Sequence, residues 1–253
     1  MVFIKRVFSF LLTICIFFAL TACGKETSSF SSSRGVVSSE ELQFMPLTEG
    51  DTIAVIETTA GNIYVVLYPQ YAPLAAQNFV LLAQQGGFDN TEFSRVIKDF
   101  VIQGGSTSGT SAYGDAFDIE VTSKLRHYSG ALSTAANHDT LPKNNGQFYI
   151  VATPQANLND DALLRMQEAG YTESELQAYK AAGGAPYLDN TDTVFGQVYA
   201  GMDVVDAIAG VKTDDNDKPK KEVLILSVSI STYAEGTDNA DSSASLKAGS
   251  GSS

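Results

Sequence analysis

Short β-prone runs separated by glycine-bearing turns fill the central part of this 253-residue chain and limit the folds open to it. Eight such runs are predicted as strands, at residues 52–57, 62–68, 92–97, 100–103, 131–134, 147–153, 194–198 and 223–230. Two core helices are predicted, one beginning near Pro73 and stopped by Gly86-Gly87, the other at about 202–209. Many short strands with few helices favour a closed or sandwiched, mainly β domain, because closure removes sheet edges that invite aggregation.

One segment departs from this pattern. Residues 160–182 are rich in Ala, Leu, Glu and Gln, follow a candidate cap at Asn159-Asp160 and are interrupted by Gly170, so two short helices are predicted. We interpret residues 158–184 as a helical insertion between strands. We favour a surface excursion whose apolar side packs on the barrel; the alternatives are a lid or partner-binding element beside the site, or an adhesive surface.

The first residues predict export. Lys5 and Arg6 precede an apolar run at 7–20, which is short for a membrane span and fits a secretory signal. Leu20-Thr21-Ala22-Cys23 resembles a bacterial lipobox, in which the cysteine is lipidated and becomes the first mature residue; the alternative is an ordinary signal peptide with an incidental cysteine. The predicted organisation is a signal peptide at 1–22, a lipidated Ser-rich tether at 23–46, one domain at 47–233 and a disordered tail at 234–253.

The net charge and the cysteine content limit the kinds of partner and cross-link expected for this chain. Loss of Lys5 and Arg6 with the signal changes the formal net charge from −13 to −15. Such an acidic surface repels nucleic acid and anionic lipid heads, so membrane attachment must come from acyl chains on Cys23, on the outer face of the cell membrane. The two cysteines are Cys15 and Cys23, which leaves the domain itself without a cysteine to form a disulfide.

Three spaced motifs then point to one family. They are Phe93-Ser94-Arg95-Val96-Ile97 with Phe100-Val101-Ile102-Gln103-Gly104-Gly105, then Gly146-Gln147-Phe148-Tyr149-Ile150, and Val194-Phe195-Gly196-Gln197-Val198 with Gly201-Met202-Asp203-Val204-Val205-Asp206. In this order they resemble the signatures of cyclophilin-type peptidyl-prolyl cis–trans isomerases, over about residues 51–232. The resemblance implies a closed eight-stranded antiparallel β-barrel capped by two helices, which agrees with the strand and helix count.

The resemblance also implies a catalytic site that needs no metal or cofactor. An X–Pro bond rotates over a barrier of ~18–20 kcal/mol, and a donor aimed at the proline nitrogen stabilises the twisted transition state. Arg95 is the predicted donor, with a surface salt bridge as the alternative role, and Gln103 is expected to hold the substrate backbone and orient Arg95. Residues expected to bind substrate are Phe100, Val101, Ala135, Gln147, Tyr149, Tyr187, Leu188 and Asp192. The histidines, His127 and His138, are expected in exposed loops, without metal-ligand spacing or a Ser-His-Asp arrangement.

Several positions depart from the family pattern. Ser94 stands where the family often has His, and Ala136 where it usually has Asn, a loss that Asn137 could replace. Tyr149, Tyr187 and Asp192 stand at family Phe, Trp and His positions, and a buried Tyr149 hydroxyl would need a partner. We predict a monomeric isomerase acting on proline-containing segments of exported proteins. The alternative is a proline-peptide binding module with little turnover.

Overall fold

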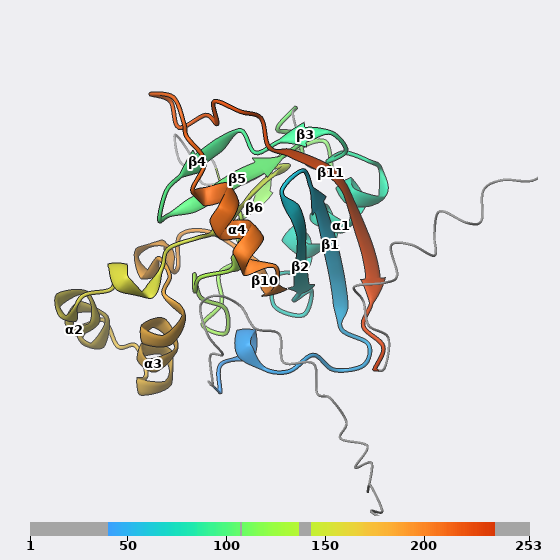
Figure 1. The fold of residues 1–253 in the computed structure, drawn as a ribbon. Helices are drawn as coiled ribbons and strands as arrows, with labels where there is room; N and C mark the ends of the chain where they lie inside the picture. Colours follow the sequence, from blue (N-terminus) through green and yellow to red (C-terminus); the bar gives the residue numbers. More distant parts are fainter. Residues whose placement is uncertain (1–39, 107, 137–142, 236–253) are drawn as a thin grey trace, which may run out of the picture.

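A curled antiparallel sheet forms the body of the computed structural model, which describes residues 40–106, 108–136 and 143–235 (Figure 1). The sheet order is β3-β11-β1-β2-β10-β7-β9-β5-β4, and every pair is antiparallel. The strands are β1 (Thr52–Thr58), β2 (Gly61–Leu67), β3 (Thr91–Glu92), β4 (Arg95–Ile97), β5 (Val101–Gly105), β7 (Ala131–Thr134), β9 (Gln147–Val151), β10 (Val194–Ala200) and β11 (Leu224–Thr232). A separate ribbon pairs β6 (Phe117–Asp118) with β8 (Lys143–Asn144).

The two ends of the sheet are neighbours in the chain. The single strand predicted at 92–97 is divided into β3 and β4, which occupy opposite ends of the strand order. The prediction of one continuous strand there was wrong, because the chain leaves β11 after Phe93, whose N–H donates to the carbonyl of Val223 (3.0 Å), and then pairs with β5. The sheet is therefore curled into a half-barrel whose two end strands, β3 and β4, follow one another in the chain.

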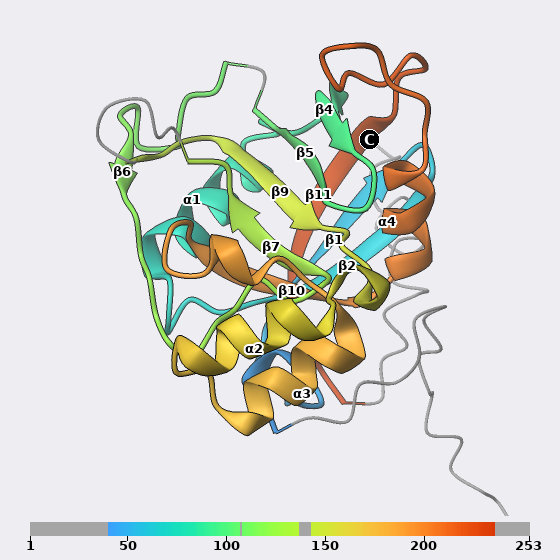
Figure 2. The same cartoon turned by 90° about the vertical axis from the view of Figure 1, so that its left-hand side faces the viewer.

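Two helices cover the curled sheet, as predicted. α1 (Pro73–Gln84) has proline at its start, and α4 (Met202–Ala209) follows Gly201. Figure 2 shows α1 and α4 on opposite sides of the sheet. Between them lies a core of aromatic rings, in which Phe79 contacts Phe88, Phe148 and Phe195 at centroid distances of 5.0–5.5 Å. Edge-to-face and tilted contacts of this kind stabilise a core beyond the area they bury.

The insertion forms two helices, as predicted, α2 (Asp160–Glu168) and α3 (Glu173–Ala182). The Asn159 side chain caps α2 by accepting the Ala162 N–H (2.9 Å), and Thr172 and Glu175 form a capping box on α3. Short 3-10 turns flank the pair at Gln155–Asn157 and Pro186–Leu188. Figure 2 shows the two helices side by side at one end of the molecule. The insertion is therefore a helical hairpin added to the barrel.

The hairpin packs on the barrel through its apolar side. Met166, Leu176 and Tyr179 are buried together with Tyr128, which precedes β7, and the Tyr128 and Tyr179 rings lie 4.4 Å apart. This contact supports the interpretation of a packed surface excursion.

The folded part begins earlier than residue 47. A 3-10 turn at Leu42–Phe44 places Gln43 in a buried site, where its amide donates to the Arg126 carbonyl and to Gln197 Oε1 and accepts the Arg126 N–H. The interpretation of all of 23–46 as tether is therefore wrong for this turn. Cys23 and the tail after residue 235 lie outside the described residues. Within the described ranges no helix has the length and apolar character needed to cross a membrane.

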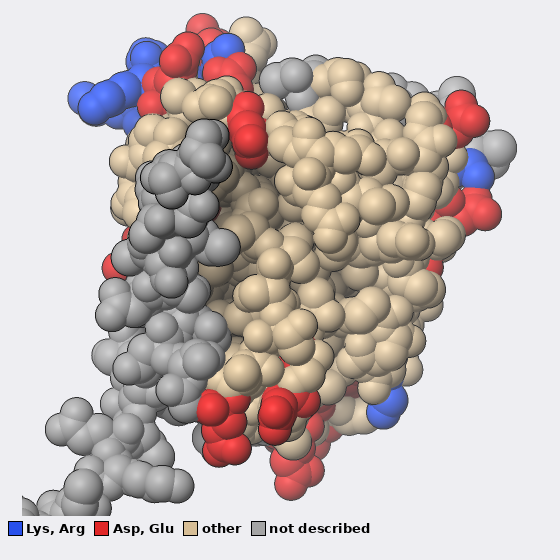
Figure 3. All heavy atoms as spheres, turned by 90° about the vertical axis from the view of Figure 1, so that its right-hand side faces the viewer, with Lys and Arg blue, Asp and Glu red and all other residues tan. Residues whose placement is uncertain are grey.

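The face opposite that of Figure 2 is largely uncharged (Figure 3). Most of the charged side chains visible in this view, acidic and basic, lie at the margins of the face.

Candidate functional site

One row of directly paired residues crosses four strands. Arg95 on β4 pairs with Gln103 on β5, Gln103 pairs with Tyr149 on β9, and Tyr149 pairs with Ser133 on β7. Directly opposed residues of an antiparallel ladder project from the same face. The neighbouring residues Ile102 and Phe148 face the core, so the row lies on the outer face of the barrel.

An apolar cluster lies beside this row and gathers most of the predicted substrate-binding residues. Val101 and Tyr149 are buried in it, and the partly buried side chains of Phe100, Ala135 and Leu188 pack against it. The structure therefore brings these five together on the outer face.

The remaining predicted residues join the same area. Tyr187 is 67% exposed and its ring lies 5.8 Å from that of Phe100. The Gln103 side chain donates to Gln147 Oε1 (3.4 Å). The Tyr149 hydroxyl donates to Asp192 Oδ2 (2.8 Å). Tyr187, Gln147 and Asp192 thus lie next to other residues of the predicted site.

The buried Tyr149 hydroxyl has a hydrogen-bond partner in Asp192. Burial first, and the negative charge of Asp192 second, raise the pKa of Tyr149 well above its ordinary value. The phenol therefore stays protonated and remains a donor to Asp192 at physiological pH. The Asp192 carboxylate therefore has a hydrogen-bond donor in the Tyr149 hydroxyl.

His127 is buried, and the prediction of an exposed loop histidine was wrong. It is 1% exposed, and its ring stacks on that of Tyr149 at 6.2 Å. Nδ1 lies 2.9 Å from Asp189 Oδ1, and Nε2 lies 3.3 Å from Ser133 Oγ. Because a carboxylate only accepts, Nδ1 carries the hydrogen. His138 and Asn137 lie outside the described residues.

Asp189, His127 and Ser133 thus form the Ser-His-Asp contact that the sequence did not predict. Ser133 is fully buried, and its hydroxyl donates to the carbonyl of Thr193 (2.8 Å). A nucleophile must be reachable and must lie free to give its proton to the base. Ser133 therefore does not meet the requirements of a nucleophile, and these three residues form a buried hydrogen-bonded group behind the outer face. We call the five residues Asp189, His127, Ser133, Tyr149 and Asp192 the buried polar layer.

Two tyrosines of the insertion donate hydrogen bonds to the buried polar layer. Asp189 Oδ2 accepts from the hydroxyls of Tyr171 (2.8 Å) and Tyr179 (2.7 Å). Burial first, and the charge of Asp189 second, raise the pKa of both phenols, so both remain donors. The helical hairpin is therefore connected to the site through one carboxylate.

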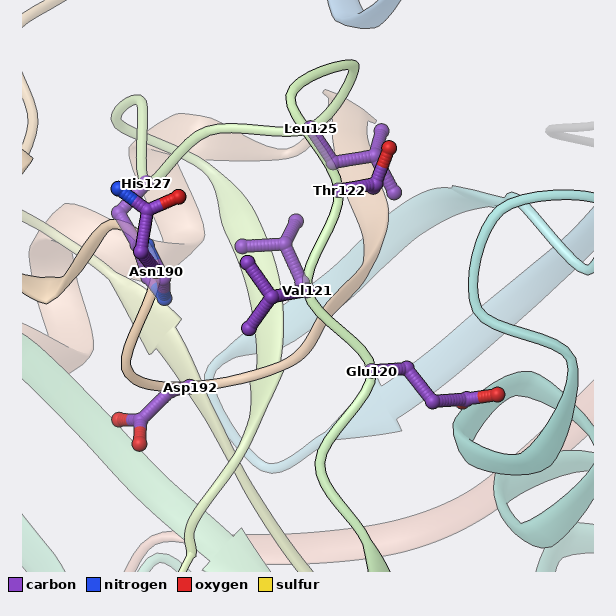
Figure 4. A pocket seen from close by; sticks show the side chains of 8 residues that line it. Glu120, Val121, Thr122, Leu125, His127, Asn190 and Asp192 are labelled. Carbon is purple, nitrogen blue, oxygen red and sulfur yellow. The ribbon is translucent and has the colours of Figure 1, made fainter.

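A small hollow lies behind the layer, between the segments before β7 and before β10 (Figure 4). Figure 4 shows His127, Asn190 and Asp192 on one side of it and Thr122 and Leu125 on the other. Its volume is about 10 Å³, which is close to the lower limit for one water molecule. The hollow is therefore too small to hold a peptide chain.

Arg95 stands at the end of the row and is half exposed. Its Nε lies 3.3 Å from Asp217 Oδ2, and the two side chains are 46% and 41% exposed. Asp217 lies between α4 and β11, and nothing in the sequence singled it out. The described residues contain no group of three or more His, Cys, Asp or Glu side chains arranged to hold a metal ion.

Comparisons with known proteins agree with the geometry. A family model described as "Cyclophilin type peptidyl-prolyl cis-trans isomerase/CLD" matches residues 53–230. A Staphylococcus aureus protein named "Putative peptidyl-prolyl cis-trans isomerase" is 36% identical over 188 residues, which cover 72% of this chain and 93% of that protein. A Streptococcus pyogenes protein named "Putative bifunctional phosphatase/peptidyl-prolyl cis-trans isomerase" is 38% identical over 202 residues. That match covers 76% of this chain and only 42% of the streptococcal protein.

A solved structure is similar as well. It is a cyclophilin-type peptidyl-prolyl cis–trans isomerase of Cryptosporidium parvum, determined in the presence of the dipeptide Ala-Pro. The TM-score is 0.56 with 26% sequence identity, and the alignment covers 72% of this chain and 99% of the other.

Proposed function

This chain belongs to the family of cyclophilin-type peptidyl-prolyl cis–trans isomerases, and on that premise we propose how its site catalyses the reaction and where it works. The chemistry requires no covalent step. In the twisted transition state the proline nitrogen loses amide resonance and regains a lone pair. A donor that meets this lone pair stabilises the twisted state more than either planar ground state, which is the condition for catalysis.

Arg95 is the donor in this proposal. A guanidinium is always charged and offers several N–H groups in a fixed fork. The observation that carries the proposal is the row Arg95–Gln103–Tyr149, which borders the apolar cluster on the outer face. A proline ring seated on Val101 and Tyr149 would place its nitrogen next to the Arg95 end of the row.

The remaining residues hold the peptide. Phe100 and Leu188 wall the proline ring, Gln103 binds the substrate backbone, and Ala135 and Gln147 border the residue before proline. The Cryptosporidium parvum relative was solved in the presence of Ala-Pro, which supports a proline dipeptide unit as the ligand class.

A protease-coupled peptide assay tests the role of Arg95. Arg95→Ala should reduce kcat/KM by about 100-fold, the range measured when one transition-state donor is removed. Arg165→Ala on α2, which removes another exposed arginine, is the matched control and should match wild type. Equal activity of wild type and Arg95→Ala would overturn the mechanism.

We further propose that the protein is lipid-anchored outside the cytoplasmic membrane and acts on exported proteins. The support is the Leu20-Thr21-Ala22-Cys23 motif after an apolar run. The segment from Cys23 to Glu40 can reach ~60 Å at most, enough to hold the domain clear of the bilayer surface. Labelled palmitate should enter wild type and not Cys23→Ala, and the variant should leave the membrane fraction or stay unprocessed. A mature N-terminus that is unmodified and elsewhere would contradict the anchor.

A further inference from the structure

We propose that Asp217 is a positioning residue that orients Arg95 for the isomerase reaction. The inference rests on the proposed role of Arg95 as donor. Its starting point is the contact between Arg95 Nε and Asp217 Oδ2 at 3.3 Å, which joins residues 122 positions apart in the chain. Asp217 acts through Arg95 and does not itself touch the substrate.

The backbone around Asp217 is fixed on the strand that carries Arg95. The Asp217 carbonyl accepts the N–H of Val96, the residue after Arg95, at 2.8 Å. Asp214 Oδ1 accepts the N–H groups of Asn216 and Lys218, each at 2.9 Å, which closes the turn on itself. The Asp217 carboxylate therefore starts from a backbone held against β4.

A second link ties the same turn to the barrel. Lys218 Nζ lies 2.9 Å from Glu92 Oε1 on β3. The turn thus contacts the barrel on both sides of the β3–β4 break, through the Asp217 carbonyl to Val96 on β4 and through Lys218 to Glu92 on β3.

The backbone conformation of Asp217 indicates that the aspartate side chain has a role beyond forming the turn. Its φ is 63°, in the left-handed region that glycine adopts most readily and that aspartate tolerates at some cost. The backbone of the turn would accept glycine, so the turn alone does not require a carboxylate at this position.

The chemistry of the guanidinium explains what the contact achieves. One N–H lies on Nε, and the other four lie on the two terminal nitrogens. A carboxylate at Nε fixes the plane of the group and leaves the terminal N–H groups to meet the proline nitrogen. Because both side chains are exposed, the pair contributes little to stability, and its effect should appear in the rate.

Asp217→Gly and Asp217→Asn test the proposal, with Asp215→Asn on the same exposed turn as the matched control. We expect Asp217→Gly to lower kcat about three- to tenfold with KM nearly unchanged, because a donor that is misplaced reduces transition-state binding alone. Asp217→Asn should retain an intermediate kcat, since its amide oxygen keeps a partial negative charge next to Nε but the side chain loses its net charge. Asp215→Asn should match wild type.

Nuclear magnetic resonance of the Arg95 Nε–Hε group gives a second readout that is independent of activity. Its resonance should shift in Asp217→Gly and stay unchanged in Asp215→Asn. An unchanged or increased kcat in Asp217→Gly, an equal loss in Asp215→Asn, or an Nε–Hε resonance identical to wild type would each overturn the inference. If Arg95→Ala is inactive while Asp217→Gly keeps full activity, only the positioning inference fails; if Arg95→Ala keeps full activity, the proposed mechanism itself fails.

Discussion

Asp189→Asn removes one negative charge from the buried polar layer and keeps the shape of the side chain. The Asp189 carboxylate is fully buried. Its oxygens accept from the backbone N–H and Nδ1 of His127 and from the hydroxyls of Tyr171 and Tyr179, at 2.7–2.9 Å. The substitution therefore tests whether this one carboxylate holds the insertion and the site together.

The expected loss of stability follows from these four contacts. A hydrogen bond to a charged group contributes ~1.5–3 kcal/mol and a neutral one ~1 kcal/mol, so loss of the charge weakens four bonds by about 4 kcal/mol in total. Part of this returns, because burying an amide costs less than burying a carboxylate, and both tyrosine hydroxyls can turn to accept from the new amide. We expect a net loss of about 2–3 kcal/mol.

Urea unfolding at neutral pH measures the effect. With a slope of about 2 kcal/mol per molar urea, the midpoint should fall by about 1 M. Asp215→Asn, an exposed substitution of the same kind, should leave the midpoint in place. A loss below about 0.5 kcal/mol in Asp189→Asn, the level of an ordinary surface change, would refute the reasoning.

Three further predictions concern the elements that surround the site. Gln43→Ala should lower the free energy of unfolding by about 1–3 kcal/mol, because it leaves buried partners unsatisfied; urea unfolding of a domain that starts at residue 40 measures this, and an unchanged midpoint would contradict the packed turn. Burial tends to raise the pKa of Glu175, but the Thr172 backbone N–H and Arg126 outweigh it and lower the pKa from 4.5. A carboxylate whose pKa is lower in the folded state stabilises it above pH 4.5, and this contribution disappears as the pH falls through the folded value. The stability difference between wild type and Glu175→Gln should therefore shrink on acidification, and parallel pH profiles would speak against it. Tyr149→Phe should cost about 1–3 kcal/mol, because Asp192 loses a buried donor; thermal unfolding measures it, and a variant as stable as wild type would show that the contact is not needed.

Local patterns predicted the elements of this fold well. The boundaries of α4 match the prediction at both ends, and the break at Gly170 gave two helices because capping and helix propensity act within a few residues. The row of Arg95, Gln103 and Tyr149 also follows from alternation along paired strands, once the motifs fix the pairing.

The errors concern polar residues whose partners are far away in the chain. His127 is buried because Asp189, 62 positions later, accepts its N–H groups, and Gln43 is buried against Arg126 and Gln197, which are 83 and 154 positions later. No local composition or periodicity encodes such a pairing, so the sequence around His127 and Gln43 gives no sign that these side chains are buried. Asp217 escaped notice for the same reason, since its partner Arg95 lies on another element.

The most direct test of the account is exchange NMR on an Ala-Pro-containing peptide with a catalytic amount of protein. Cis and trans proline signals interconvert too slowly for exchange peaks without a catalyst, because the uncatalysed step takes tens to hundreds of seconds. Wild type should produce exchange peaks, and Arg95→Ala should lose them while peptide titration still shifts the Tyr149 and Phe100 signals. Exchange peaks of equal intensity with both proteins would contradict the central claim that Arg95 stabilises the twisted proline bond.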